Sequence, residues 1–97
     1  MQLLPGNEMG YQERHDALWP ELKELLKAAG IKNYSIFLEE KTGGLFAYLE
    51  APNDKIFDTL AKQPAMKKWW QFMKDIMETN EDGSPVSQPL KEVFYLP

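Results

Sequence analysis

Apolar residues recur along this chain with two different spacings, and each spacing predicts one kind of element. From Asn7 to Gly30 the spacing is helical, with a clear apolar stripe in the second half of the segment. Asn7 suits an N-cap, and Gly30 is a natural stop because glycine readily adopts the left-handed conformation that ends many helices. Pro20 lacks a backbone donor, so we expect the helix to kink or restart between Asp16 and Pro20.

The middle of the chain has the pattern of a β-hairpin. Ile31–Glu40 alternates in part between two sides, as a strand does. Lys41–Gly44 contains two glycines and predicts the turn, and Leu45–Ala51 is the return strand. The remaining predicted elements are an apolar strand at 1–4, helices at 52–62 and 65–78, a polar loop at 79–89 and a closing strand at 93–96.

This order predicts an α+β fold of the ferredoxin-like type, β-α-β-β-α-β, with a four-stranded antiparallel sheet and helices on one face. Neighbouring residues of a strand point to opposite faces of a sheet. The strand aromatics Phe37, Phe46, Tyr48 and either Phe94 or Tyr95 therefore cannot all point toward the helices. A large exposed aromatic face usually marks an interface, so we expect a homodimer that packs through the open sheet face.

Length and composition restrict the class of protein. The 97 residues are expected to form one domain, 1–97. The chain has no cysteine, which excludes disulfides and thiolate chemistry. Its net charge of −4 argues against nucleic acid as a partner, because phosphate binding needs a basic patch. No apolar run approaches the ~20 residues of a membrane span and no secretory signal pattern opens the chain, so we expect a cytoplasmic protein.

The only histidine, His15, has an aromatic residue four positions away on each side, Tyr11 and Trp19. Side chains four residues apart share one face of a helix. Imidazole has an ordinary pKa of roughly 6.5, the closest of any side chain to neutral pH, so proton-transfer chemistry points first to His15. A lone helical histidine is nevertheless more often a surface or core residue, and Trp19 also suits a core stripe.

Trp69 and Trp70 are adjacent in the predicted helix 65–78, where neighbouring side chains point about 100° apart. One indole is expected in the core, and the other either covers surface or lines a pocket. Flat aromatic faces pack well on the C–H faces of a sugar. Tyr34 could reach the mouth of the same pocket or form a cross-strand pair. A single histidine without thiols makes a metal site poorly supported, and no cofactor site is predicted.

Several stretches spread over the whole chain form a combination that is more specific than any one of them. They are Tyr11-x-x-x-His15, Trp19-Pro20-Glu21-Leu22, Asn33-Tyr34, Trp69-Trp70, Ser84-Pro85-Val86-Ser87 and Glu92-Val93-Phe94-Tyr95-Leu96-Pro97. In this combination the chain strongly resembles the L-rhamnose mutarotases. Members of that family begin several residues earlier with a longer first strand, so we expect either that the start of this chain is trimmed or that Met1–Leu4 forms only a stub of the strand.

The resemblance implies an isomerase that interconverts the α and β anomers of L-rhamnose, built as a dimeric α+β barrel. It also implies that His15 is the proton donor and that Tyr11, Tyr34, Trp69 and Trp70 contact the sugar. Ring opening needs one proton delivered to the ring oxygen and another removed from the anomeric hydroxyl. General acid–base catalysis of this kind accelerates a reaction by roughly 10²–10⁴-fold, and no cofactor is needed because no electrons move.

Two other functions fit the same scaffold, because one fold can host many chemistries. The first is a cofactor-independent monooxygenase of the dimeric α+β barrel type, which oxygen uptake with a quinol-like substrate would reveal. The polar, tryptophan-lined site argues against this alternative. The second is a non-catalytic sugar-binding or interaction module, which would bind rhamnose without accelerating anomer exchange.

Overall fold

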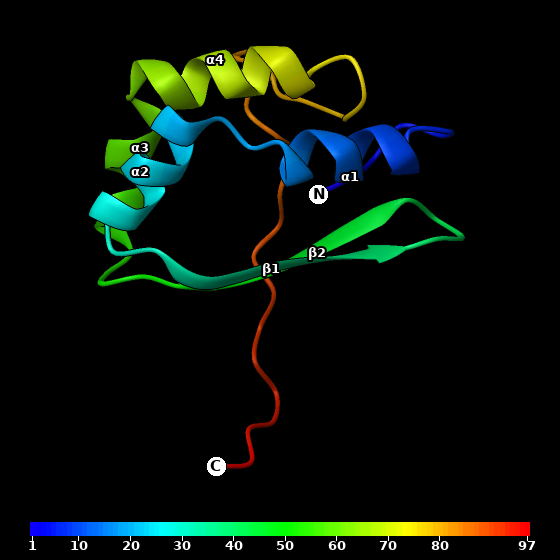
Figure 1. The fold of residues 1–97 in the computed structure, drawn as a ribbon. Coiled ribbons are helices and arrows are strands. Elements are labelled where there is room, and N and C mark those ends of the chain that lie inside the picture. The colour runs from blue at the N-terminus through cyan, green and yellow to red at the C-terminus, as the bar shows by residue number, and fades with distance from the viewer.

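The computed structural model describes residues 1–97 and arranges them in two layers. Helices form one layer, a two-stranded antiparallel hairpin forms the other, and the far face of the hairpin is uncovered (Figure 1). In chain order the elements are α1 (Glu8–Asp16), α2 (Pro20–Ala28), β1 (Lys32–Glu39), β2 (Gly44–Glu50), α3 (Lys55–Ala61) and α4 (Pro64–Met73). The prediction of an α+β protein with its helices on one face of the sheet is confirmed.

The predicted restart of the first helix is also confirmed. α1 ends at Asp16 and α2 begins at Pro20, where the missing backbone donor costs nothing because the first helical position has no partner for it. Gly30 ends α2 in the left-handed conformation, with φ of +85°. Its N–H bonds to the carbonyl of Lys27, and the next N–H, of Ile31, bonds to that of Leu26, which together form a Schellman motif.

The hairpin has the predicted alternation of faces. Phe37 lies opposite Phe46 in the register, and Leu38 lies opposite Leu45. The ladder is irregular between Lys32 and Ser35, where Asn33 has a φ of +52°. Such an irregularity redirects side chains near the start of a strand. Beyond Asn33, the side chains of Tyr34, Ile36 and Leu38 alternate onto the inner face of the hairpin.

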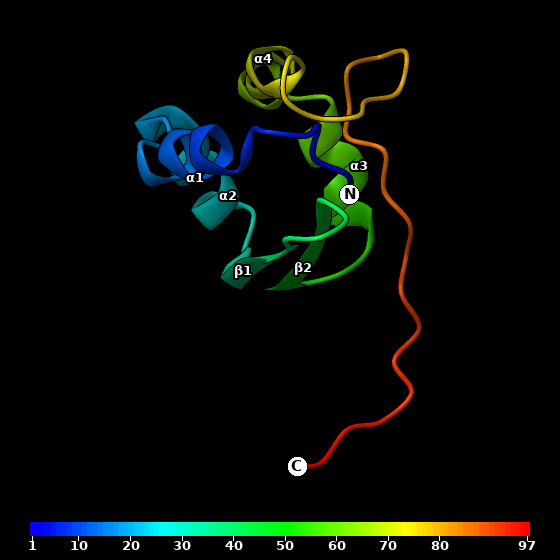
Figure 2. The same ribbon diagram turned by 90° about the vertical axis from the view of Figure 1, so that its right-hand side faces the viewer.

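The hydrophobic core lies between the helices and the inner face of the hairpin. Viewed from the side, the helices arch over the hairpin (Figure 2). The core side chains come from the N-terminal segment, the helices, β2 and the loop after α4: Leu3, Tyr11, Leu22, Leu45, Trp69, Met73, Ile76 and Met77. No helix is long and apolar enough to cross a bilayer.

The prediction of a four-stranded sheet is wrong for this chain, and the first missing strand is residues 1–4. Gln2 and Leu3 form only isolated bridges, to Gly44 and Met77 respectively. The segment is short because Pro5 has no backbone donor and Gly6 turns the chain at once, with φ of +80°. The expected stub is therefore present, but it consists of isolated bridges.

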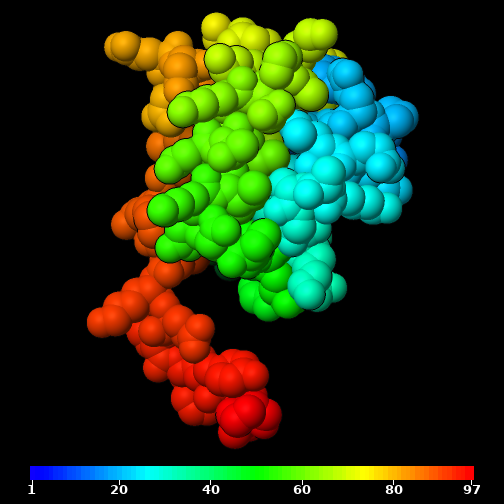
Figure 3. All heavy atoms as spheres, turned by 90° about the vertical axis from the view of Figure 1, so that its left-hand side faces the viewer, coloured from blue at the N-terminus to red at the C-terminus, as the bar shows by residue number.

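The closing strand predicted at 93–96 is the second that is missing. After the N–H of Val86 bonds to the carbonyl of Glu78, residues 87–97 form no backbone hydrogen bond. This C-terminal tail leaves the body and extends past the hairpin (Figure 3). A strand exists only where a neighbour pairs with it, and the preference of valine and aromatics for strands is a preference for a half-buried surface. The path of the tail offers no such surface within the chain, and Phe94 and Tyr95 are 78% and 71% exposed.

The helix predicted at 65–78 is also too long. α4 begins at Pro64 and ends at Met73. Beyond it the backbone pairs with the N-terminal segment: the N–H of Leu4 bonds to the carbonyl of Ile76, and the N–H of Glu78 bonds to that of Gln2. Because these bonds need an extended chain, the helix stops before them. Ile76 is nevertheless buried, which explains why its apolar character continued the helical pattern in the sequence.

The aromatic open face of the hairpin is confirmed for three residues. Phe37, Phe46 and Tyr48 point away from the helices and are 61%, 49% and 57% exposed. The expected fourth member, Phe94 or Tyr95, lies on the C-terminal tail and not on this face. The hairpin thus presents a row of aromatic side chains that nothing in its own chain covers.

Candidate active site

A cavity of about 880 Å³ lies between the helices and the inner face of the hairpin. It brings together the predicted site residues from α1, β1 and α4: Tyr11, His15, Tyr34, Trp69 and Trp70. Its apolar wall is formed by side chains from α2, the hairpin, α4 and the loop after it: Leu22, Ile36, Leu38, Leu45, Met66, Met73 and Met77. Residues that are far apart in the sequence therefore form one concave site with both apolar and polar side chains, as small-molecule sites do.

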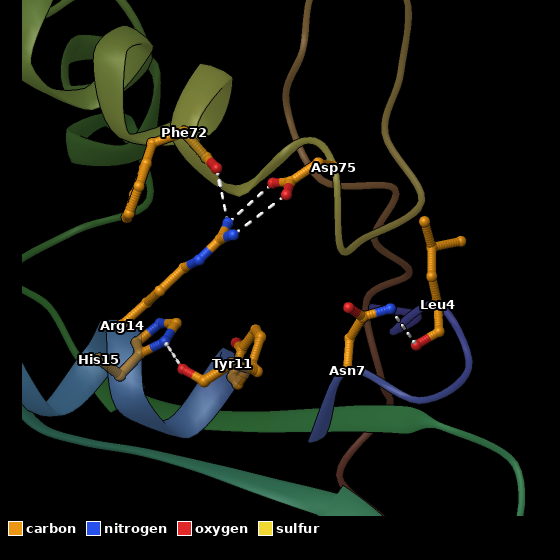
Figure 4. A network of polar contacts seen from close by, with 7 residues as sticks. All are labelled: Leu4, Asn7, Tyr11, Arg14, His15, Phe72 and Asp75. Carbon is orange, nitrogen blue, oxygen red and sulfur yellow. Dashed lines mark hydrogen bonds and ion pairs between the residues drawn. The ribbon is translucent and has the colours of Figure 1, made fainter. Parts of the chain in front are cut away.

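The imidazole of His15 is oriented by its own helix. Nδ1 lies 2.9 Å from the carbonyl oxygen of Tyr11, one turn earlier on α1 (Figure 4). A carbonyl oxygen can only accept a hydrogen bond, so Nδ1 carries the proton and donates it. This assignment leaves Nε2 as the ring atom that can exchange a proton with a ligand in the cavity.

Aromatic rings surround His15 on two sides. The ring of Tyr11 stacks on the imidazole with centroids 4.3 Å apart, and the indole of Trp69 meets it edge to face at 5.3 Å. Trp19 does not share a continuous helix with His15, because it is the N-cap of α2. Its indole packs edge to face on Trp69 at 5.2 Å and supports that side chain from outside the cavity.

The adjacent tryptophans have different environments, as their helical spacing predicts. Trp69 is only 7% exposed and belongs to the core, whereas Trp70 is partly buried and packs against it. Both indoles line the cavity, so the two alternatives weighed for the second indole resolve in favour of a pocket position. Tyr34 also lines the cavity at the start of the inner face of the hairpin, although 44% of its surface is exposed.

Both cavity tyrosines remain neutral well above physiological pH. Burial raises the pKa of Tyr11 well above its usual range, and the negative charge that Tyr34 would carry when ionised raises it further. Burial of its phenol group also raises the pKa of Tyr34. At neutral pH the two hydroxyls can therefore donate and accept hydrogen bonds, but neither acts as a charged base.

We expect Tyr11→Phe to remove part of the alkaline sensitivity of the fold. Above about pH 10 the unfolded chain releases the Tyr11 proton and the folded chain keeps it, so stability falls by about 1.4 kcal/mol per pH unit from this group. Urea unfolding of both proteins between pH 8 and 12 measures the slope. Below pH 10 the free energies of unfolding of the two proteins should differ by a constant amount. Equal slopes of this free energy against pH above pH 10 would contradict the raised pKa of Tyr11.

One polar network near the cavity was not anticipated from the sequence. Arg14, the only arginine of the chain, reaches from α1 to the end of α4 (Figure 4). Its Nη1 and Nη2 donate to the two carboxylate oxygens of Asp75 at 2.8 and 3.0 Å, and Nη1 also donates to the carbonyl of Phe72 at 2.7 Å. The pairing raises the pKa of Arg14 and lowers that of Asp75. The sequence feature that could have pointed to Arg14 is its position next to His15, since each is the only residue of its type in the chain.

The predicted residues contribute one titratable ring, two neutral phenols and two indoles to a cavity that charged side chains such as Asp16 and Lys27 also line. Such a set can bind an uncharged polyhydroxylated ring and can exchange protons with it. No group of three or more histidine, aspartate or glutamate side chains is placed to hold a metal ion.

Comparison with known proteins places this arrangement in a family. The family model described as L-rhamnose mutarotase matches residues 1–96. An L-rhamnose mutarotase of Listeria monocytogenes serotype 4b is 56% identical over 99% of this chain and 92% of its own length. One from Leptothrix cholodnii is 53% identical over 99% of this chain and 91% of its own length.

A solved structure agrees with the sequence comparison. The crystal structure of an L-rhamnose mutarotase from Formosa agariphila superimposes with a TM-score of 0.91 at 52% identity. The superposition covers 100% of this chain and 93% of the other. The match therefore includes both the cavity-forming body and the C-terminal tail. This chain belongs to the L-rhamnose mutarotase family.

Proposed function

We propose that this chain is an L-rhamnose mutarotase that interconverts the α and β anomers of the free sugar through the open-chain aldehyde. The observation that carries the proposal is the position of His15, whose Nδ1 is engaged by its own helix while its ring lines the cavity between Tyr11 and Trp69. The family match over residues 1–96 supports the choice of reaction and sugar.

In the first half of the reaction, protonated His15 delivers its Nε2 proton to the ring oxygen of the sugar. The bond between the anomeric carbon and the ring oxygen breaks, and its electron pair stays on the ring oxygen as a hydroxyl. The anomeric hydroxyl loses its proton and becomes the aldehyde oxygen. We assign this proton to a water molecule oriented by the neutral hydroxyls of Tyr11 and Tyr34, because neither phenol is a charged base at neutral pH.

In the second half, rotation about the bond to the aldehyde carbon presents the other face of the carbonyl. Neutral His15 takes the hydroxyl proton as that oxygen attacks, and the aldehyde oxygen is protonated to regenerate the anomeric hydroxyl. The overall reaction consumes no proton and no electron. The same imidazole serves as acid and then as base, so each turnover returns it to its starting protonation state.

The apolar wall supports a 6-deoxy sugar as substrate. Trp69 and Trp70 offer flat faces to the C–H faces of the pyranose ring. The methyl group that L-rhamnose carries at its sixth carbon gains free energy when it is buried against apolar side chains such as Met66 and Met73. A sugar with a hydroxymethyl group there would bury an additional hydroxyl without a partner, which is unfavourable.

Saturation-transfer NMR between the two anomeric protons of L-rhamnose tests the function directly. The protein should accelerate exchange in L-rhamnose and affect glucose far less. Oxygen uptake with quinol-like substrates and rhamnose binding without faster exchange are the results expected of the monooxygenase and of the non-catalytic module. Neither alternative is favoured by the family match, which covers the whole domain. The cytoplasmic location and the lack of nucleic acid or membrane partners stay predictions.

We also propose that two copies of the chain associate through the open face of the hairpin. Phe37, Phe46 and Tyr48 form an exposed aromatic patch there, and such patches on otherwise soluble domains usually mark interfaces. The pairing of Phe37 with Phe46 across the two strands makes the patch contiguous. A twofold axis would bring the same patch of both copies together.

Phe46→Glu is expected to separate the copies, because a twofold interface would bury two carboxylates without partners. Analytical ultracentrifugation should give twice the 11.3 kDa chain mass for the unaltered protein and a single chain mass for the variant. Phe57→Glu is the matched control, since Phe57 is a 42% exposed phenylalanine on α3 and not on the hairpin. Equal masses for both variants would contradict the proposed interface.

A further inference from the structure

α1 carries both Tyr11 and His15, yet few contacts fasten this helix to the rest of the molecule. Tyr11 is its only buried residue. At its start the side-chain amide of Asn7 donates to the carbonyls of Leu4 and Pro5, and does not cap the helix. The hydrogen bond of His15 stays within α1. Toward the C-terminal end of α1, polar contacts with α4 and the turn after it come from Arg14, and the ring of His15 meets Trp69.

Arg14 makes three kinds of contact at the C-terminal end of α4. Its guanidinium makes a two-point contact with the carboxylate of Asp75, and it donates to the carbonyl of Phe72, which belongs to the last turn of α4. The last carbonyls of a helix have no partner within it and carry a partial negative charge, which favours a cation there. The guanidinium carbon also lies 4.5 Å from the centroid of the Phe72 ring.

These contacts connect Arg14 to the cavity-lining residues His15 and Trp69 through a closed series of side-chain contacts. His15 meets Trp69 at 5.3 Å, and Trp69 packs on Phe72 at 5.7 Å. Phe72 lies under the guanidinium of Arg14, which neighbours His15 on α1. Neighbouring residues of a helix point about 100° apart, so one turn of α1 sends Arg14 to α4 and His15 to the cavity. A shift of this turn of α1 relative to α4 would therefore move both side chains together.

The arrangement suits positioning better than stability. The Arg14 and Asp75 side chains are 23% and 66% exposed, and exposed ion pairs add little to the stability of a fold. The two-point geometry nevertheless restricts direction, because a guanidinium fork matches a carboxylate in one plane. A displacement of a catalytic group by about 1 Å can slow a reaction by about 100-fold.

We propose that Arg14 and Asp75 are positioning residues that hold α1 against the end of α4, so that His15 faces the sugar beside Trp69. Neither residue lines the cavity, and each acts through His15. The proposal rests on the proposed function for its catalytic consequence. Its geometric content, the contact between the His15 and Trp69 rings, stands independently.

Arg14→Met and Asp75→Asn test the positioning role of the Arg14–Asp75 pair through anomer exchange of L-rhamnose. Each should lower kcat by about 10- to 100-fold with a much smaller change in KM. The double variant should be no slower than the slower single one, because both remove the same contact. Arg14→Lys should recover only part of the rate, since an ammonium group cannot form the planar two-point contact. Lys74→Met is the matched control: it removes a positive charge from an exposed residue beside Asp75 and should leave kcat unchanged.

The nuclear Overhauser effect between the His15 ring and the Trp69 indole supplies a readout without substrate. It should be strong in the unaltered protein and weak in Arg14→Met and Asp75→Asn. The chain's single histidine identifies the imidazole signals, and Trp69→Phe identifies the indole among the three tryptophans. An unchanged effect together with unchanged kcat in folded variants would overturn the proposal. Loss of folding in both variants would also overturn it, because the residues would then be structural. If the unaltered protein does not accelerate exchange, the proposed function fails. The Overhauser effect still shows whether Arg14 and Asp75 position His15 beside Trp69.

Discussion

Replacing His15 by glutamine should slow the enzyme-catalysed exchange of L-rhamnose anomers by about 10²- to 10⁴-fold, which is about 3–5 kcal/mol of transition-state stabilisation. Glutamine places an amide about where the imidazole has Nε2, but it cannot take up and release a proton near neutral pH. The substitution would therefore keep a polar side chain in the cavity while removing the acid and base. Saturation-transfer NMR at a fixed protein concentration measures the rate.

Glu13→Ala is the matched control for this prediction. Glu13 lies two residues before His15 on the same helix, but it is exposed and does not line the cavity. Its removal should leave the rate within a small factor of that of the unaltered protein. A His15→Gln variant that exchanges anomers as fast as the unaltered protein would remove the imidazole from the mechanism and leave the proton transfers to solvent.

Trp69→Ala should lower the free energy of unfolding by about 3–5 kcal/mol, a large part of the stability of a domain of this size. The indole is 7% exposed and contacts His15, Trp19 and Phe72, so its loss leaves a cavity where three rings now meet. Urea unfolding monitored by far-ultraviolet circular dichroism measures the change. The protein concentration must be the same for all samples, because association would also stabilise the folded state.

Trp70→Ala provides a comparison that uses the same chemical change one residue away. Trp70 is only partly buried at the edge of the core, so the loss of stability should be smaller. Both indoles line the cavity, and both variants should bind L-rhamnose more weakly. Equal losses of stability in the two variants would contradict the separation of one core indole from one cavity-edge indole.

Local signals in the sequence were sufficient for much of the fold. Pro20 and Gly30 mark the start and the end of α2 through backbone chemistry that does not depend on the rest of the protein. The glycines after Lys41 predict the hairpin turn, and the alternation along β1 predicts which side chains face the helices. These features depend on neighbours in the chain, which a sequence displays directly.

Features that depend on distant partners could not be predicted in the same way. The apolar pattern continues through Ile76, but hydrogen bonds to residues 2–4 end α4 at Met73. The run Val93–Leu96 has the composition of a strand, but it lies in the C-terminal tail without a neighbour. Composition states a preference for a strand, whereas a ladder needs a second backbone at the right distance.

The candidate site shows the same division. The resemblance implied five residues, and the structure brings all five to one cavity: Tyr11, His15, Tyr34, Trp69 and Trp70. Their catalytic and binding roles stay proposals. The spacing of Trp19 suggested that it joins His15, but the break at Pro20 turns it toward Trp69. Arg14 and Asp75 are far apart in the sequence, and only the packing of α1 against α4 makes them neighbours.

The C-terminal tail has a consequence for proteolysis. The cavity draws no side chain from beyond Pro85, and residues 87–97 form no backbone hydrogen bonds. Exposed, unpaired chain is the preferred substrate of proteases, and Lys91 offers trypsin a cleavage site within the tail. In a free single chain this bond can be cut while the body stays folded, and the shortened product retains every side chain that lines the cavity. Limited digestion can therefore separate the catalytic body from its apolar extension without any substitution.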